Sequence, residues 1–118
     1  MIMNNKDKGN LGETIAAQYL KNLGYEIFER NWRYSNIGEI DIIALDKNTL
    51  VFVEVKARRG LGFGHPFEAI DTKKFQQVQN IARAYMAQKN CKYKTCRIDA
   101  ISVILSNPPK IEHIKNIF

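Results

Sequence analysis

The residues best suited to chemistry lie in one stretch of the chain, Gly38–Arg59. It contains two apolar runs, Ile40–Leu45 and Leu50–Val55, which are separated by the polar segment Asp46–Thr49. Turn-forming residues between two short apolar runs predict a β-hairpin. Because strand side chains alternate between two faces, a charged residue within such a run interrupts a surface that would otherwise be apolar.

Three charged residues interrupt this hairpin: Asp41, Glu54 and Lys56. A carboxylate in an apolar strand is costly to desolvate unless a positive charge compensates it. We expect Asp41 and Glu54 to face each other and to hold Mg²⁺ or Mn²⁺, with water and a backbone carbonyl as further ligands. Lys56 would then hold an attacking water or stabilise the charge that builds on a phosphate. The alternative is a structural ion pair between Lys56 and one carboxylate on a solvated sheet face.

The composition is that of a globular protein with excess positive charge. We expect one domain, 1–118, because this length supports a single core. Lys and Arg outnumber Asp and Glu by 18 to 12, which suits a polyanionic partner. No apolar stretch is long enough for a membrane span or a signal peptide, so we expect no membrane partner and a cytoplasmic location.

A first helix is predicted from about Leu11 to Leu23, where apolar residues recur at helical spacing and Gly24 follows as a stop. Glu13 lies at the edge of the apolar arc, so its carboxylate would lean toward the sheet. Two interpretations of Glu13 stay open. It is either a further acidic residue at the metal or the partner of Asn10 in a capping box.

The remaining elements are predicted from apolar patterning and turn residues. They are a strand at Tyr25–Arg33, a helix from Asp71 or Thr72 to about Lys89, a strand at Arg97–Leu105 and a short terminal strand or edge segment at Ile111–Phe118. The order helix, three strands, helix, one or two strands predicts an α/β fold. In it, three strands meander and the return strand lies parallel after a helical crossover.

Basic residues lie near the predicted site. Arg58 and Arg59 open a glycine-rich segment after Lys56, where we expect them to contact phosphates. Lys74, in the second helix, either reaches the nucleic acid or the site, or belongs to a solvated helix face. Asp99 is expected to form a salt bridge with Arg97 or a lysine.

The chain resembles the PD-(D/E)XK nuclease superfamily and, more narrowly, the YraN-like family of small bacterial proteins, which are relatives of Holliday junction resolvases. The resemblance rests on ordered segments: G-N-L-G-E at Gly9–Glu13, G-Y at Gly24–Tyr25, R-N-W-R at Arg30–Arg33, G-E-I-D at Gly38–Asp41, V-F-V-E-V-K-A-R at Val51–Arg58, F-G-H-P at Phe63–Pro66 and R-I-D at Arg97–Asp99. It implies a restriction-endonuclease-like α-β-β-β-α-β core, with a mixed central sheet flanked by helices. It also favours Glu13 as an additional acid at the metal and matches Lys74 to a lysine of the family.

The leading hypothesis is a Mg²⁺- or Mn²⁺-dependent endonuclease that hydrolyses phosphodiesters of branched or damaged DNA. Asp41 and Glu54 would hold the metal, Glu13 would assist directly or through water, and Lys56 would orient the attacking water. The alternative is a non-catalytic nucleic-acid-binding or adaptor module that retains the fold. RNA is the alternative to DNA, and a homodimer is a candidate assembly because resolvase-like cutting needs two symmetric sites.

Overall fold

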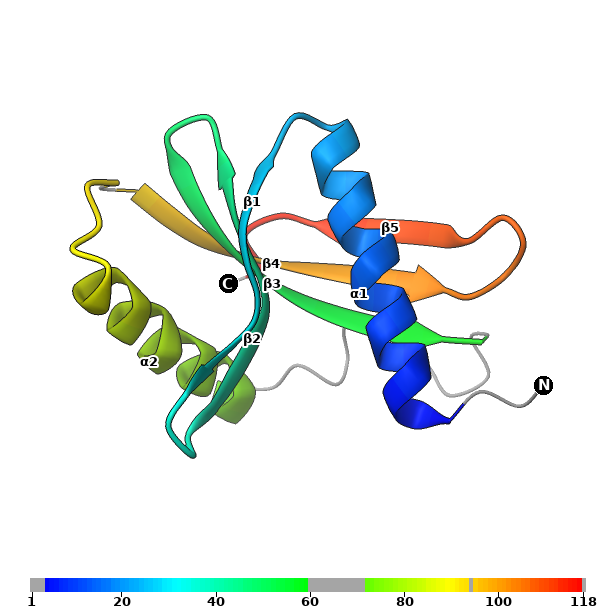
Figure 1. Ribbon diagram of the computed structural model, residues 1–118, viewed down its shortest axis with the longest axis horizontal. Coiled ribbons are helices and arrows are strands. Elements are labelled where there is room, and N and C mark those ends of the chain that lie inside the picture. Colours follow the sequence, from blue (N-terminus) through cyan, green and yellow to red (C-terminus); the bar gives the residue numbers. More distant parts are fainter. Residues whose placement is uncertain (1–3, 60–71, 94, 118) are drawn as a thin grey trace.

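The protein is built on a mixed sheet that carries one helix on each face. The computed structural model describes residues 4–59, 72–93 and 95–117. In chain order (Figure 1) the elements are α1 Asn5–Asn22, β1 Glu26–Tyr34, β2 Gly38–Asp46, β3 Thr49–Arg58, α2 Thr72–Gln88, β4 Thr95–Ile104 and β5 Lys110–Ile114. The predicted α/β fold and its α-β-β-β-α-β core are confirmed. Within the described part of the chain, no helix is long and apolar enough to cross a membrane.

The sheet has the strand order β1-β2-β3-β4-β5. The first three strands form an antiparallel meander, whereas β4 runs parallel to β3, in register from Thr49↔Thr95 to Arg58↔Ile104. A parallel neighbour requires a long crossover, and α2 lies in that connection. β5 pairs antiparallel with β4 and forms the edge opposite β1. The predicted meander and parallel return strand are therefore correct.

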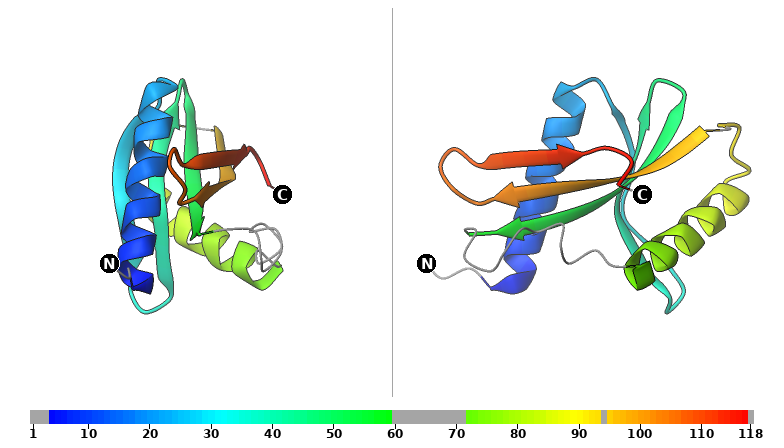
Figure 2. Two further views of the ribbon diagram at one scale, coloured as in Figure 1. Left: turned by 90° about the vertical axis from the view of Figure 1, so that its right-hand side faces the viewer. Right: turned by 180° about the vertical axis from the view of Figure 1, so that it is seen from behind.

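Two apolar layers join the helices to opposite faces of the sheet (Figure 2). On one face, Ala16 and Leu20 of α1 belong to a buried cluster with Val53 of β3. On the other face, Ile81 of α2 belongs to a buried cluster with Phe52 of β3. The neighbours Phe52 and Val53 thus face different layers, as strand alternation requires.

The N-cap of helix α1 lies six residues before Asn10, the cap in the capping-box interpretation. Asn4 is the N-cap, and its Oδ1 atom accepts a hydrogen bond of 2.8 Å from the backbone N–H of Asp7. Asn10 lies inside the helix, so the predicted capping box between Asn10 and Glu13 is wrong. The early turns are polar and largely exposed, so they lack the apolar period on which the prediction relied.

A buried polar network joins β4 and β5 to α1. The carboxylate of Asp99 accepts hydrogen bonds from Arg97 Nε at 3.0 Å, His113 Nε2 at 2.8 Å and the Asn116 backbone N–H at 2.9 Å. Tyr19 of α1 hydrogen-bonds the other ring nitrogen of His113 at 3.2 Å. Burial raises the pKa of Asp99, but these hydrogen bonds outweigh it and hold the pKa below its usual value. The expected ion pair with Arg97 is confirmed.

Gly12 allows α1 to approach β3 closely. A Cβ atom at Gly12 would lie 2.5 Å from the Cβ of Ala57, which is far inside van der Waals contact. Because Glu13 is the next residue, this close approach also fixes how near its carboxylate comes to the sheet.

We expect Gly12→Ala to lower the free energy of unfolding by about 1–3 kcal/mol, because the added methyl overpacks the contact with Ala57. Gly9→Ala is the matched control. It lies in the same helix with nothing within 4 Å of its added Cβ, so the change should be neutral or stabilise by up to about 1 kcal/mol through helix propensity. Urea denaturation measures both. If the two variants had the same free energy of unfolding, α1 would be able to shift away from β3 without losing stability.

Candidate active site

The candidate site lies where β2 and β3 separate. Their backbone pairing extends from the turn to the Ile42↔Val53 pair and ends there. Beyond that point, β2 stays paired with β1 as far as Gly38, and β3 stays paired with β4 as far as Arg58. Figure 1 shows β2 turning toward the start of α2 while β3 continues behind α1. The separation lets side chains from both faces of the sheet come together.

Asp41 lies at this separation. Asp41 and Glu54 are the next residues of β2 and β3 beyond the last backbone pair, Ile42↔Val53. The Oδ2 atom of Asp41 accepts a hydrogen bond of 2.8 Å from the backbone N–H of Val55, so a side chain takes a donor that a paired strand would otherwise use. Burial raises the pKa of Asp41, although the Val55 N–H and the charge of Lys74 oppose that rise.

Glu54 is a buried carboxylate on the α2 face, only 9% exposed. Its Oε2 atom lies 3.6 Å from Nζ of Lys74 in the first turns of α2. Its Oε1 atom is buried and has no hydrogen-bond partner among the described residues. Burial, and then the negative charge of Asp41, raise the pKa of Glu54 to about 8 despite Lys74. The unpartnered oxygen marks a place where a cation or water would bind.

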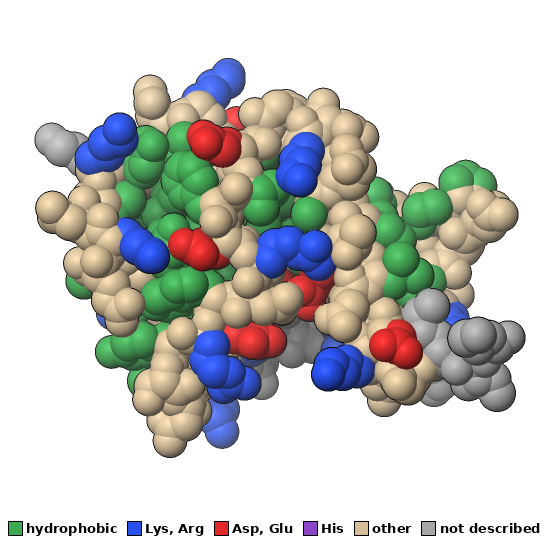
Figure 3. All heavy atoms as spheres, in the orientation of Figure 1, with side chains coloured by type: hydrophobic (Ala, Val, Ile, Leu, Met, Phe, Trp, Pro, Cys, Tyr) green, Lys and Arg blue, Asp and Glu red, His purple; other side chains and the backbone are tan. Residues whose placement is uncertain are grey.

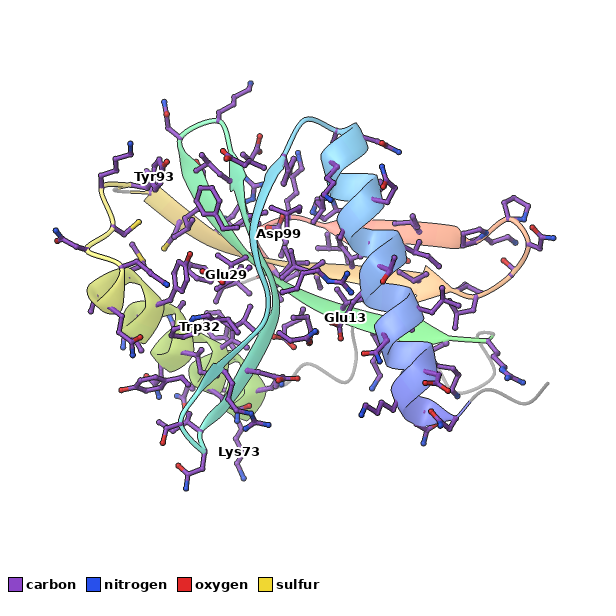
Figure 4. The ribbon with its side chains drawn as sticks, viewed as in Figure 1. Glu13, Glu29, Trp32, Lys73, Tyr93 and Asp99 are labelled. Carbon is purple, nitrogen blue, oxygen red and sulfur yellow. The ribbon has the colours of Figure 1, made fainter. Side chains whose placement is uncertain are left out.

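Glu13 comes to the same place from the opposite face, on the side of α1 that faces the sheet (Figure 4). Its Oε1 atom is also buried without a partner in the described part of the chain. Burial and the charge of Asp41 raise the pKa of Glu13, and a hydrogen bond from the Asn31 side chain lowers it. The charge of Glu13 in turn contributes to the raised pKa of Glu54. The three carboxylates therefore form one electrostatic unit.

Sequence reasoning missed Asn31. It lies between the pairs Arg30↔Ile42 and Trp32↔Ile40, hence opposite Asp41, and has a left-handed φ of 53°. Asparagine tolerates this conformation better than most residues with a side chain. The apolar alternation of the strand does not reveal a left-handed residue, because alternation assumes that every residue of the strand is extended. The only available signal was its place in the R-N-W-R segment.

The predicted basic residues divide into two groups. Lys56 is exposed near the acids, and its charge lowers the pKa of Asp41, while Lys74 lies against Glu54. Arg58 and Arg59 lie at the end of β3, further from the acids along the strand, and Arg59 is exposed. Figure 3 shows acidic side chains near the middle of the face that carries α1, bordered by Lys and Arg. The glycine-rich segment after Arg59, and the F-G-H-P segment within it, lie outside the described residues.

The donor set suits a hard cation with few protein ligands. Among residues 4–59, 72–93 and 95–117, no group of three or more His, Cys, Asp or Glu side chains is arranged to hold a metal. Mg²⁺ is typically held by one or two carboxylates and keeps several waters. Asp41 and Glu54 provide such a pair, and the unpartnered oxygen of Glu54 is a vacant donor. Glu13 is then suited to act through water.

The raised pKa of Glu54 predicts a specific pH dependence of stability in metal-free protein. The folded chain retains this proton up to about pH 8, whereas the unfolded chain loses it near pH 4.5, the ordinary pKa of a glutamate side chain. The folded state therefore binds more protons across this window, and its stability falls as pH rises. Relative to Glu54→Gln, the melting temperature of wild type should fall by roughly 10 °C between pH 5.5 and 8.5. Parallel pH profiles of the two proteins in a chelator would contradict the raised pKa of the buried Glu54 carboxyl.

Comparison with known proteins identifies the family. The model of the uncharacterised protein family UPF0102 matches residues 12–103. A UPF0102 protein from Caldanaerobacter subterraneus subsp. tengcongensis is 49% identical over 121 residues, covering 98% of each chain. One from Persephonella marina is 47% identical and covers 94% of this chain and 92% of its own, and one from Clostridium botulinum is 49% identical and covers 97% and 95%. The chain therefore belongs to the UPF0102 family, the YraN-like family that its sequence resembles.

Proposed function

We propose that this protein is a Mg²⁺- or Mn²⁺-dependent endonuclease that hydrolyses phosphodiester bonds of DNA. The observation that carries the proposal is the buried carboxylate of Glu54, which has one unpartnered oxygen and lies beside two further acids. The charge of Asp41 raises the pKa of both Glu13 and Glu54, and such clustered carboxylates are a liability for a purely structural protein. A divalent cation would relieve that repulsion, and the exposed Lys56 gives the site a second positive charge.

The three acidic residues and Lys56 have different roles in the proposed reaction. Asp41 and Glu54 would hold the metal, and Glu13 would act on it through water. A bound Mg²⁺ would polarise the phosphate and lower the pKa of water. Lys56 donates a hydrogen bond to the attacking water or to the phosphate oxygen on which charge builds. The attacking water loses one proton to solvent as its oxygen forms a bond to phosphorus, one P–O ester bond breaks, and the leaving oxygen takes a proton from solvent.

DNA is the proposed partner because the chain has a net charge of +6 even with its acids included. Arg58 and Arg59 extend along β3 beyond Lys56, where a nucleic-acid backbone that reaches the site would meet them. We place the activity in the cytoplasm and propose branched or damaged DNA as the first substrates to test.

We predict that Lys56→Ala and Glu54→Ala abolish Mg²⁺-dependent cutting of linear, flapped and four-way DNA while leaving DNA binding nearly intact. Loss of one electrostatic stabiliser costs about 10²–10³ in rate. Lys110→Ala, at an exposed lysine on the edge strand β5, is the matched control and should cut normally. Gel-based cleavage and fluorescence anisotropy give the two readouts. A wild type that binds DNA but never cuts would favour the adaptor module instead.

The metal itself is tested by melting. Mg²⁺ at about 100 times its Kd should stabilise wild type by about 2.7 kcal/mol. Asp41→Asn should lose this rise in melting temperature, because it removes one charged ligand. An equal rise in both proteins would reflect general salt effects and would count against a metal at Asp41.

Binding through phosphates predicts a salt signature. Neutralising Arg58 or Arg59 should weaken affinity alike for all DNA sequences and reduce the slope of log K against log salt by about one unit. Fluorescence anisotropy over a salt series measures this slope, with Lys110→Ala again as the control. If neither substitution changed the slope, the DNA backbone would not run along β3.

A further inference from the structure

The ammonium of Lys74 lies close to Glu54, which is one of the two proposed metal ligands. Lys74 projects from the first turns of α2, and its Nζ atom lies 3.6 Å from Oε2 of Glu54. Its side chain is 40% exposed, whereas that of Glu54 is 11% exposed. A long, partly solvated ammonium thus reaches in from the helix to a buried carboxylate.

The charge of Lys74 acts on both proposed metal ligands. It opposes the rise in pKa of Glu54 and also that of Asp41. The charge of Lys56 lowers the pKa of Asp41 less than the charge of Lys74 does. Of these two lysines, Lys74 is therefore the one whose charge acts most on Asp41 and Glu54.

We propose that Lys74 is a built-in counter-cation of this site, which holds Glu54 until a divalent cation displaces its ammonium. This inference rests on the proposed function, because it assumes that Asp41 and Glu54 bind a metal. It assigns Lys74 a positioning role at the acids, in addition to the phosphate contact expected from the sequence.

The displacement follows from charge and geometry. A divalent cation on Glu54 would repel an ammonium held a few ångströms away. The lysine side chain has a flexible four-carbon stem and is 40% exposed, so its Nζ atom can move away from Glu54. Once displaced it still projects from the start of α2, beside the site, where a phosphate held by the metal would attract it.

The test is calorimetric titration of Mg²⁺ into wild type and Lys74→Met at pH 8.5, where protons compete least for Glu54. Removing the competing ammonium should tighten Mg²⁺ binding about fivefold, the size expected for one partly exposed charge. Lys73→Met changes the net charge equally at the neighbouring exposed position (Figure 4) and should alter affinity less than about twofold. Lys74→Arg keeps the charge and should bind Mg²⁺ as wild type does.

The outcomes separate this inference from the proposed function. Equal Mg²⁺ affinity in wild type and Lys74→Met, with binding lost in Asp41→Asn, would overturn the role of Lys74 and leave the metal site standing. No Mg²⁺ binding in any variant would overturn both. Binding by Lys74→Met but not by wild type would show that the ammonium blocks the site and is not displaced, and would overturn the proposed displacement.

A second measurement follows the lysine directly in the wild-type protein. On saturation with Mg²⁺, the NMR signals of the Lys74 side-chain ε-CH₂ group should shift, while those of Lys73 should not. Unchanged Lys74 signals at full Mg²⁺ occupancy would overturn the proposed displacement, whatever the affinities of the variants.

Discussion

The candidate site depends on one hydrogen bond, between the backbone N–H of Val55 and the carboxylate of Asp41. In a continuous sheet this N–H would pair with the neighbouring strand, and the two faces would stay separated by a closed layer of backbone. Here a side chain satisfies the donor, so β2 is free to leave β3 without leaving a buried amide unpaired. Glu13 from one face and Glu54 from the other can then act on each other through Asp41. The chemistry of the site follows from a local break in pairing.

Bringing three acids together has to be offset by rigid support, because their repulsion would otherwise push the elements apart. Gly12 brings α1 into contact with β3, and the network around Asp99 ties the same helix to β4 and β5. On the other face, Gln77 of α2 donates a hydrogen bond to the carbonyl of Ile37 at the tip of the β1–β2 hairpin. Each helix is thus fastened to the sheet by contacts that lie outside the acidic cluster. Such fixed surroundings are what a preorganised site requires.

The local part of this arrangement was predictable from sequence and the long-range part was not. The β2–β3 hairpin that carries Asp41 and Glu54 follows from strand alternation and from a four-residue turn, both of which are encoded within a few residues. The true start of α1 at Asn5, after the N-cap Asn4, was missed because a polar, exposed turn has no apolar period. The contact between Lys74 and Glu54 depends on where the crossover helix packs across the sheet, which no local pattern records. The left-handed Asn31 departs from the strand geometry that alternation presumes.

The parallel pairing of β3 with β4 has a consequence for the order of folding. The β2–β3 hairpin closes over a short turn, whereas Thr49 and Thr95 meet across 46 residues of sequence. Hairpins form within microseconds, and contacts of long sequence separation form later because loop closure costs entropy. We therefore expect the acidic pair to be assembled before α2 delivers its lysine. During that interval the carboxylates are accessible to cations from solution. The cations present while the chain folds therefore influence how the site is assembled.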